Sequence, residues 1–210
     1  MKLGYFDFNP DYSIRPDDLA LALEERGYDS LWLGEHINIP ISRRTPYPLG
    51  GELPKYYSHM RDPFISLTSA AAVTKNLKLA TGICLLAERD PITTAKEVAT
   101  LDSLSNGRVI FGIGGGWNVE EMENHGMPFN RRWKVLRERV LAMKPSGRGT
   151  NPRFMASLSI SIGSGHIPSQ PKSRIRRLSW AVLNRRACSG LWTIATGGAR
   201  QIPGLRTSRG

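Results

Sequence analysis

The sequence predicts an α/β fold built on a parallel β-sheet, and three observations lead to this prediction. Strand-like and helix-like segments alternate four times along residues 1–144, a pattern typical of a parallel sheet that is either open or closed into a barrel. Polar or glycine-rich residues follow each strand-like segment, at the edge where both kinds of sheet bind ligands. The same residues carry 18 basic and 18 acidic side chains, the balanced composition of a globular domain.

Each strand and helix is expected from its own local pattern. Short apolar runs predict strands at Lys2–Phe8, Ser30–Gly34, Lys78–Ile83 and Arg108–Ile113. Helical spacing of apolar residues, with proline in the first turn of three segments, predicts helices at 16–26, 62–74, 91–104 and 131–143. Gly27 is expected to end the first helix. The last helix is expected to bury Trp133, Leu136, Val140 and Met143.

The segment Ile37–Arg61 is much longer than an ordinary loop between a strand and a helix. It is rich in proline, tyrosine and glycine, and it follows the second predicted strand. Long loops at the ligand-binding edge often form a lid or a substrate wall. The alternative is a surface insertion without a functional role.

A glycine-rich turn follows the fourth predicted strand. Gly112, Gly114, Gly115 and Gly116 precede Trp117, and Asn118 then opens a short helix with Glu120 and Glu121. Such a turn lets the backbone approach a phosphate, although glycines also serve tight geometry alone. The spacing and position differ from those of a dinucleotide-binding fingerprint, and no Gly-Lys-Ser/Thr follows as in a P-loop.

Histidine and tryptophan supply the remaining candidate site residues. His36, beside Glu35 at the end of the second strand, is a candidate proton donor or cofactor contact, and its alternative is a hydrogen-bonded rim histidine without chemistry. Trp117 is expected to form a site wall, whereas Trp32 lies inside an apolar strand and is expected in the core. His59 and His125 lack ligand-spaced partners, so no metal site is predicted.

Four segments together resemble the luciferase-like monooxygenase superfamily, in the branch that uses the deazaflavin coenzyme F420. They are residues 27–36, 77–83, 90–108 and 112–117, and they include the run Ala-Thr-Leu-Asp-Ser-Leu-Ser-Asn-Gly-Arg at 99–108. The order and spacing of these segments agree with the family over residues 1–144. The resemblance implies a (β/α)8 TIM barrel with the flavin at the carboxyl rim, of which this chain encodes about the first four βα units.

The resemblance also implies roles for individual residues. His36 matches a histidine near the cofactor ring, and Glu35 stands where many relatives have aspartate, so these two are the candidate catalytic residues. In relatives, the segment that matches the third strand end often contains a non-prolyl cis peptide bond. The residues implied in cofactor binding are Thr81, Gly82, Ile83, Gly114, Gly115, Gly116 and Trp117.

The implied reaction is hydride transfer between C5 of F420 and an unknown small organic substrate. Some deazaflavin relatives have a catalytic glutamate after the glycine turn, where this chain has Trp117. Relatives that use FMN insert oxygen instead, so an FMN-dependent monooxygenase is the alternative of the same family. An alternative of another class is an inactive fragment whose basic tail binds nucleic acid.

The composition changes abruptly after Lys144. Residues 145–210 contain 11 Lys and Arg but no Asp or Glu, so they hold the whole formal charge of +11. The family resemblance ends at Lys144, before the later barrel strands and the family's phosphate-binding elements. We therefore expect residues 145–210 to be out of frame and disordered, and the sheet edge beside the fourth strand to be open. Lysine-rich runs and interleaved aromatic residues are missing from this segment, which disfavours nucleic-acid binding.

Composition also bounds location and partners. The first residues contain no signal-peptide pattern, and no apolar run is long enough to cross a bilayer. Cys84 and Cys188 form no disulfide framework, so a reducing cytoplasm is expected. The expected partner is a small-molecule substrate rather than a membrane. The resembling family is often homo-oligomeric, and the oligomeric state of this chain stays open.

Overall fold

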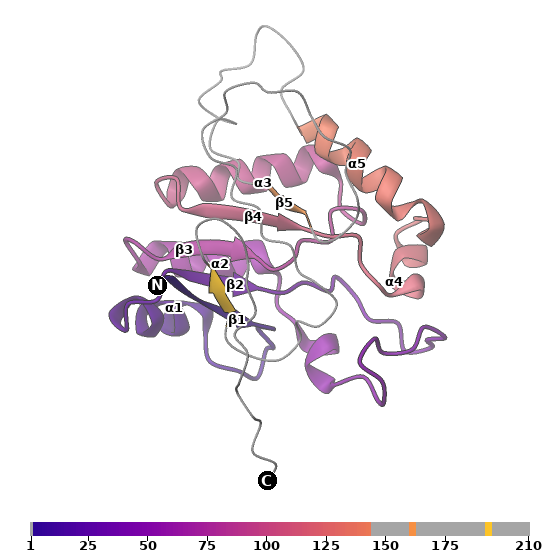
Figure 1. Cartoon of the computed structure of the whole chain (residues 1–210), viewed down its shortest axis with the longest axis horizontal. Coiled ribbons are helices and arrows are strands. Elements are labelled where there is room, and N and C mark those ends of the chain that lie inside the picture. The colour runs from indigo at the N-terminus through magenta and orange to yellow at the C-terminus, as the bar shows by residue number, and fades with distance from the viewer. Residues whose placement is uncertain (1, 144–159, 163–191, 195–210) are drawn as a thin grey trace, which may run out of the picture.

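A computed structural model describes residues 2–143, 160–162 and 192–194 of the chain (Figure 1). Its centre is a six-stranded sheet in the order β5-β4-β3-β2-β1-β6. The four strands β1 to β4 are parallel neighbours in chain order. Their bounds are Lys2–Asp7, Ser30–Leu33, Lys78–Thr81 and Val109–Ile113. The predicted α/β fold with a parallel sheet is therefore confirmed, and each strand lies within its predicted range.

Four helices lie side by side and cover one face of this sheet (Figure 1). They are α1 Pro16–Glu25, α2 Pro63–Val73, α3 Pro91–Leu104 and α5 Arg132–Met143. Asp62 and Asp90 cap α2 and α3 by accepting hydrogen bonds from the amides of Ile65 and Thr93. Three shorter helices complete the described chain: η1 Lys55–His59, α4 Val119–Asn124 and η2 Phe129–Arg131.

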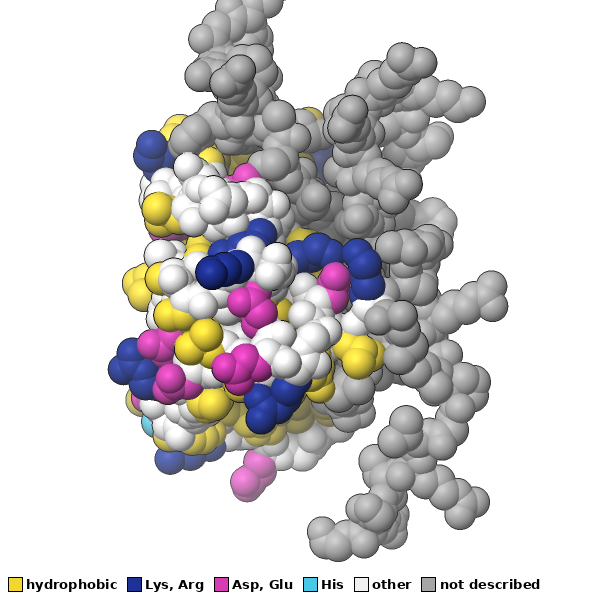
Figure 2. All heavy atoms as spheres, turned by 90° about the vertical axis from the view of Figure 1, so that its left-hand side faces the viewer, with side chains coloured by type: hydrophobic (Ala, Val, Ile, Leu, Met, Phe, Trp, Pro, Cys, Tyr) yellow, Lys and Arg dark blue, Asp and Glu magenta, His cyan; other side chains and the backbone are white. Residues whose placement is uncertain are grey.

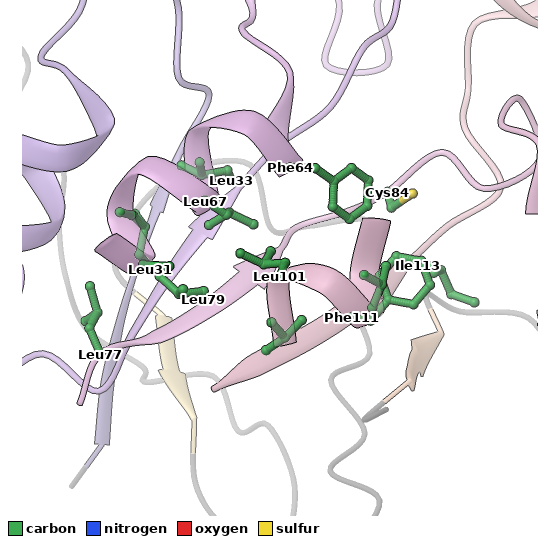
Figure 3. Close-up of a cluster of buried hydrophobic side chains, with 14 of the residues drawn as sticks. Leu31, Leu33, Phe64, Leu67, Leu77, Leu79, Cys84, Leu101, Phe111 and Ile113 are labelled. Carbon is green, nitrogen blue, oxygen red and sulfur yellow. The ribbon is translucent and has the colours of Figure 1, made fainter. Parts of the chain in front are cut away.

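The core forms where the strands face these helices (Figure 3). Strand residues alternate between the two sides of the sheet, so Leu31 and Leu33 of β2 and Phe111 and Ile113 of β4 meet leucines of α2 and α3. Leu31, Leu33 and Ile113 have no exposed surface, and Phe111 is almost as deeply buried. Burial of this apolar surface is the main force that holds the four βα units together.

The opposite side of the sheet carries small residues under one large ring. A Cβ atom added to Gly4 would lie 3.0 Å from Trp32 Nε1, and one added to Gly82 would lie 3.3 Å from Trp32 Cβ. The indole N–H of Trp32 donates to Ser30 Oγ over 2.9 Å, and the residue is buried. The prediction that Trp32 belongs to the core is confirmed.

Two predictions about packing are wrong. The edge beside β4 is not open in the described structure, because β5, Ile160–Ile162, pairs with β4 in parallel. The other edge is also paired, since β6, Trp192–Ile194, runs antiparallel to β1. Unpaired strand edges expose backbone donors and acceptors that any available segment satisfies. The expectations of disorder and a lost reading frame for the rest of 145–210 fall outside the described residues.

The second error concerns Trp133. In α5, Leu136, Val140 and Met143 are buried as expected, but Trp133 is 42% exposed. Its ring lies on the glycine turn instead, where a Cβ atom on Gly115 would come within 2.9 Å of Trp133 Cζ3. Helical spacing alone could not reveal that this first-turn position faces the turn rather than the sheet.

The amino-terminal edge of the sheet is a surface of mixed charge. Figure 2 shows this side, with basic and acidic side chains interspersed among apolar ones. Asp29 pairs with Lys78 over 2.9 Å and with Lys2 over 3.6 Å. Exposed pairs of this kind contribute little stability, and this edge lies opposite the carboxyl ends of the strands. No helix in the described ranges is long and apolar enough to cross a membrane.

Candidate active site

The candidate site lies at the carboxyl edge of the sheet, where the chain leaves β2, β3 and β4 (Figure 1). His36 follows β2, the Gly82–Ile83 peptide follows β3, and the glycine turn follows β4 and leads into α4. The sequence predicted that polar groups from these strand ends share one rim. The structure brings His36 and Trp117 into direct contact, although 81 residues separate them.

His36 is held by a partner on each ring nitrogen. Nδ1 lies 2.6 Å from Glu121 Oε2, and the indole N–H of Trp117 donates to Nε2 over 3.2 Å. Because an indole N–H can only donate, Nε2 must accept, and the ring proton therefore sits on Nδ1 and is donated to Glu121. The side chain is 7% exposed. His36 is thus held in one orientation, with Nδ1 as donor to Glu121 and Nε2 as acceptor from Trp117.

Glu121 is the residue that orients His36. Besides the imidazole, its carboxylate accepts the backbone N–H of Ile37 over 2.9 Å and that of Asn38 over 3.3 Å. Asn118 caps α4 and accepts the amides of Glu120 and Glu121, which sets the position of both glutamates. The carboxylate therefore ties the end of β2 to the start of α4.

Glu120 fixes the next part of the long loop in the same way. It accepts the backbone N–H of Arg44 over 2.8 Å and the hydroxyl of Thr45 over 2.6 Å, and Arg44 Nε donates to it over 3.0 Å. Burial favours a higher pKa, but the hydrogen bonds from Thr45 and Arg44 outweigh it and lower the pKa of Glu120 to about 2. Both ends of the segment 37–45 are therefore hydrogen-bonded to the glutamates of α4. This favours a fixed wall over a moving lid.

Aromatic rings from the loop pack around His36. The ring centroid of Tyr57 lies 5.1 Å from that of His36 and 6.0 Å from that of Trp117. Tyr47 lies 5.5 Å from Tyr57, and Phe8, after β1, stacks on Tyr56 at 4.2 Å. These contacts exclude water from one side of the imidazole and make the rim next to it apolar.

Glu35 is placed differently from His36. One carboxylate oxygen accepts the amide of Leu85 over 2.6 Å, and the other accepts Arg89 Nε over 2.7 Å and also Arg89 Nη2. Arg89 pairs in addition with Asp62 over 2.6 Å and with Glu97 over 3.3 Å. With both oxygens engaged and the side chain 1% exposed, Glu35 is suited to hold the β3–α3 segment rather than to transfer a proton.

Glu88 is an acid that the sequence did not single out. Its residue is 7% exposed, and neither carboxyl oxygen has a hydrogen-bond partner within the described structure. Burial raises the pKa of Glu88 to about 9, reinforced by the charges of Glu121 and Glu35 and opposed by Arg139. A Cβ atom on Gly116 would lie 3.2 Å from Glu88 Oε1. Glu88 is therefore a protonated acid at neutral pH, packed directly against the glycine turn.

The segments expected to bind cofactor meet one another at the rim. The peptide bond Gly82–Ile83 is cis, as the family resemblance implied. The turn residue Gly114 lies against Ile83, since a Cβ atom there would come within 1.7 Å of Ile83 Cδ1. Gly82 and Ile83 are partly exposed. Thr81, by contrast, is buried and bonds to the backbone of Gly112, so its hydroxyl serves the β3–β4 contact.

Comparison with known proteins identifies the family. The sequence profile of the luciferase-like monooxygenase family matches residues 15–164. The chain belongs to this family. An uncharacterised protein of Mycobacterium tuberculosis is 43% identical over 147 residues, which cover 69% of this chain and 52% of that protein. The chain thus spans about half the length of the first curated relatives that it matches.

Solved structures of family members share the fold. The oxygenating component of 3,6-diketocamphane monooxygenase from Pseudomonas putida, in complex with FMN, has a TM-score of 0.59 and 19% identity, over 78% of this chain and 51% of that one. The coenzyme F420-dependent tetrahydromethanopterin reductase of Methanopyrus kandleri has a TM-score of 0.51 and 22% identity, over 78% and 51%. The described sheet and helices correspond to part of the TIM barrel of these neighbours.

Sequence reasoning missed four residues of this site: Glu121, Glu88, Tyr57 and Arg89. Glu121 was visible as an acid at the start of the short helix, but its partner His36 lies 85 residues away. Tyr57 belongs to the loop whose length had already marked it as a candidate wall. Glu88 and Arg89 gave no signal, because burial and long-range pairing decide their roles.

Proposed function

We propose that this protein contributes the first half of the catalytic barrel of an oxidoreductase that transfers hydride between coenzyme F420 and a small organic substrate. The observation that carries the proposal is His36, fixed by Glu121 and Trp117 at the strand ends beside the glycine turn. Among the family's structures, the Methanopyrus kandleri reductase is named as F420-dependent. Its identity to this chain is too low to transfer a substrate.

The described residues fit a planar, partly apolar cofactor. Ile83 packs over the buried Gly114 and is itself partly exposed, so its side chain offers an apolar contact to a ring. Trp117, partly exposed at the same rim, and Tyr57 close the side next to His36. We propose that the segment 81–83 and the turn 114–116 hold the ring. A bound deazaflavin would supply the hydride chemistry, and the protein supplies position and electrostatics.

His36 is suited to handle the proton that accompanies hydride transfer. Its Nε2 lone pair is the basic site, because Nδ1 is protonated and bound to Glu121. A proton taken up at Nε2 would replace the Trp117 hydrogen bond, and the Glu121 carboxylate would stabilise the resulting imidazolium. The aromatic rings of Tyr57 and Trp117 limit the access of water to that proton.

An FMN-dependent monooxygenase is the second candidate. It is favoured by the 3,6-diketocamphane monooxygenase, whose structure contains FMN and shares this fold with a TM-score of 0.59. An apolar contact at Ile83 suits either ring system. The glycine turn and Trp117, which resemble the F420 branch, support the first candidate over this one.

Cofactor titration tests the choice. Because residues 145–210 are expected to be out of frame, the titration uses the chain read in the frame that continues the barrel after Lys144, here called the restored chain. Tighter binding of reduced F420 than of FMN is expected, together with F420-linked turnover of a ketone or alcohol library. Micromolar binding of FMN alone would reject the F420 assignment. The 210-residue chain is the comparison, and weak binding or none is expected from it.

A further inference from the structure

The long loop and η1 share a face that does not include His36 or Trp117. A cavity of about 260 Å³ opens on this face. Its lining combines apolar residues with two cations and a hydroxyl: Ile39, Pro40, Ile41, Leu53, Pro54, Arg43, Lys55 and Ser58. No acidic residue belongs to this lining. Pockets for drug-sized ligands are about 300–1,000 Å³, so this one suits a smaller molecule.

Arg43, one of the residues that line this cavity, has a buried polar atom without a partner among the described residues. Its Nη1 is buried, and it has no hydrogen-bond partner within the part of the chain that the structure describes. Buried polar atoms are nearly always paired, and a charged donor left alone costs more than a neutral one. The guanidinium group therefore has an unmet requirement for an acceptor at this position.

The adjacent Arg44 differs from Arg43, because its guanidinium group forms ion pairs. Arg44 pairs with Glu120 over 3.0 Å and with Glu123 over 3.0 Å. No ion pair of Arg43 occurs among the described side chains. Arg43 lines the cavity without an ion-pair partner among the described side chains, one residue from an arginine that is paired with two carboxylates.

The rest of the lining defines the ligand more closely. Lys55 adds a second positive charge, and its Nζ lies 5.2 Å from the ring centre of Tyr12. Ile41 is fully exposed, with a relative exposure of 106%, at the edge of the apolar part. A ligand that satisfies both parts carries one anionic group and a short apolar body.

We propose that this cavity binds a small organic anion, with its carboxylate or phosphate group on Arg43 and Lys55 and its apolar chain against Ile39, Ile41 and Leu53. Carboxylate and phosphate share the oxygen geometry that a guanidinium group recognises. The site is separate from the proposed catalytic rim and does not depend on the function proposed there.

The cavity also lies one short helix away from that rim. Lys55 and Ser58 of η1 face the cavity, whereas Tyr57 of the same helix packs on His36 at 5.1 Å. A ligand that immobilises Lys55 and Ser58 therefore also restricts the ring next to the imidazole. Binding in the cavity is expected to shift the NMR signals of the His36 imidazole without direct contact.

The test is calorimetric and NMR titration of the 210-residue protein with octanoate and octyl phosphate. Octanol, which lacks the charge, and inorganic phosphate, which lacks the chain, are the ligand controls. Binding of one or both amphipathic anions, at least about 10-fold tighter than octanol, is expected because a charge-assisted hydrogen bond is worth about 1.5–3 kcal/mol. Preference between octanoate and octyl phosphate identifies the head group.

Two variants locate the ligand. Arg43→Gln and Lys55→Gln should each weaken binding by about 10-fold or more, whereas Arg44→Gln, which removes the same charge one residue away, should change it less than about 3-fold. Unchanged melting temperatures identify variants that still fold. The proposal is overturned if octanol binds as tightly as octanoate, if neither anion binds, or if folded Arg43→Gln and Lys55→Gln proteins both bind like the parent.

Discussion

The imidazole Nδ1 of His36 lies 2.6 Å from the carboxylate of Glu121, and this contact joins the end of β2 to the helix after β4. Together with the indole N–H of Trp117, which donates to Nε2, it places the ring proton on Nδ1 and leaves Nε2 as the basic nitrogen. The two glutamates at the start of α4 have different roles. One orients the imidazole and the other holds the loop beside it.

Replacement of Glu121 should release the histidine. In Glu121→Gln, the amide cannot accept a charge-assisted bond from Nδ1, so the imidazole should populate both tautomers and exchange its ring proton faster. Nitrogen-15 NMR of the histidine ring measures the tautomer ratio. Glu123→Gln, an exposed glutamate on the same helix, is the matched control and should keep the parent ratio. An unchanged ratio in Glu121→Gln would show that Trp117 alone sets the tautomer.

Loss of the imidazole should remove proton handling. In the restored chain, His36→Ala is expected to lower turnover by about 10²–10⁴-fold, the usual contribution of a general acid or base. Cofactor affinity should change less than turnover, because the proposed contacts with the ring come from residues 81–83 and 114–116 rather than from His36. Steady-state kinetics with F420 separate the two effects. Turnover equal to that of the parent would leave His36 with a purely structural role.

Glu88 should make the folded state less stable as the pH rises. Its pKa is raised from 4.5 to about 9, so between these values the folded state holds a proton that the unfolded state has released. The stability linked to Glu88 is therefore complete below about pH 4.5 and declines until about pH 9. At pH 7 the loss amounts to at most about 3 to 4 kcal/mol, because each pH unit above 4.5 costs about 1.36 kcal/mol.

Glu88→Gln tests this dependence, because the amide keeps the shape and carries no titratable proton. Its free energy of unfolding should exceed that of the parent at neutral pH, and the decline between about pH 5 and 9 should flatten. Urea unfolding across this range measures both. Glu138→Gln on α5, an exposed side chain, serves as the control. Parallel curves for parent and Glu88→Gln would mean that Glu88 is ionised in the folded protein.

Removal of the Glu120 carboxylate should release the part of the long loop that it holds, at Arg44 and Thr45. In Glu120→Gln, the backbone amides of Arg44 and Thr45 lose a charged acceptor, so their hydrogen exchange should accelerate by about 10-fold or more. The amides within α2 should keep their rates. Low pH should have the same effect on the parent, because the hydrogen bonds to Glu120 are present above about pH 4.5 and are lost as the pH falls towards 2. Equal exchange in both proteins would show that the aromatic packing alone holds the loop.

The gene itself tests the status of residues 145–210. If they are out of frame, one of the other two frames after the codon for Lys144 should encode an acid-containing segment with alternating strand and helix patterns. The acid-free composition of 145–210 motivates this expectation. Sequencing of the locus and translation in all three frames is sufficient. A stop codon or a patternless sequence in both alternative frames would establish the basic segment as the native one.

Local patterns sufficed for most of the fold. Apolar runs, helix-starting prolines and the glycines at turns depend on residues a few positions apart, so β1 to β4 and their helices fall within a few residues of their predicted bounds. The same patterns failed for Trp133, whose contact with Gly115 depends on the position of a turn elsewhere in the chain. They also failed at the edge of β4, where a segment after Lys144 pairs.

The candidate site also has features that local patterns predict and features that they do not. Local patterns were enough to place His36, the glycine turn and Trp117 at strand ends, and the carboxyl ends of parallel strands meet at one edge. Which acid pairs with the histidine became clear only in the folded chain. Glu35, adjacent in sequence, is taken by Arg89, whereas Glu121, 85 residues away, orients the imidazole. Charged side chains pair with whichever partner burial brings within reach, and burial is a property of the folded chain.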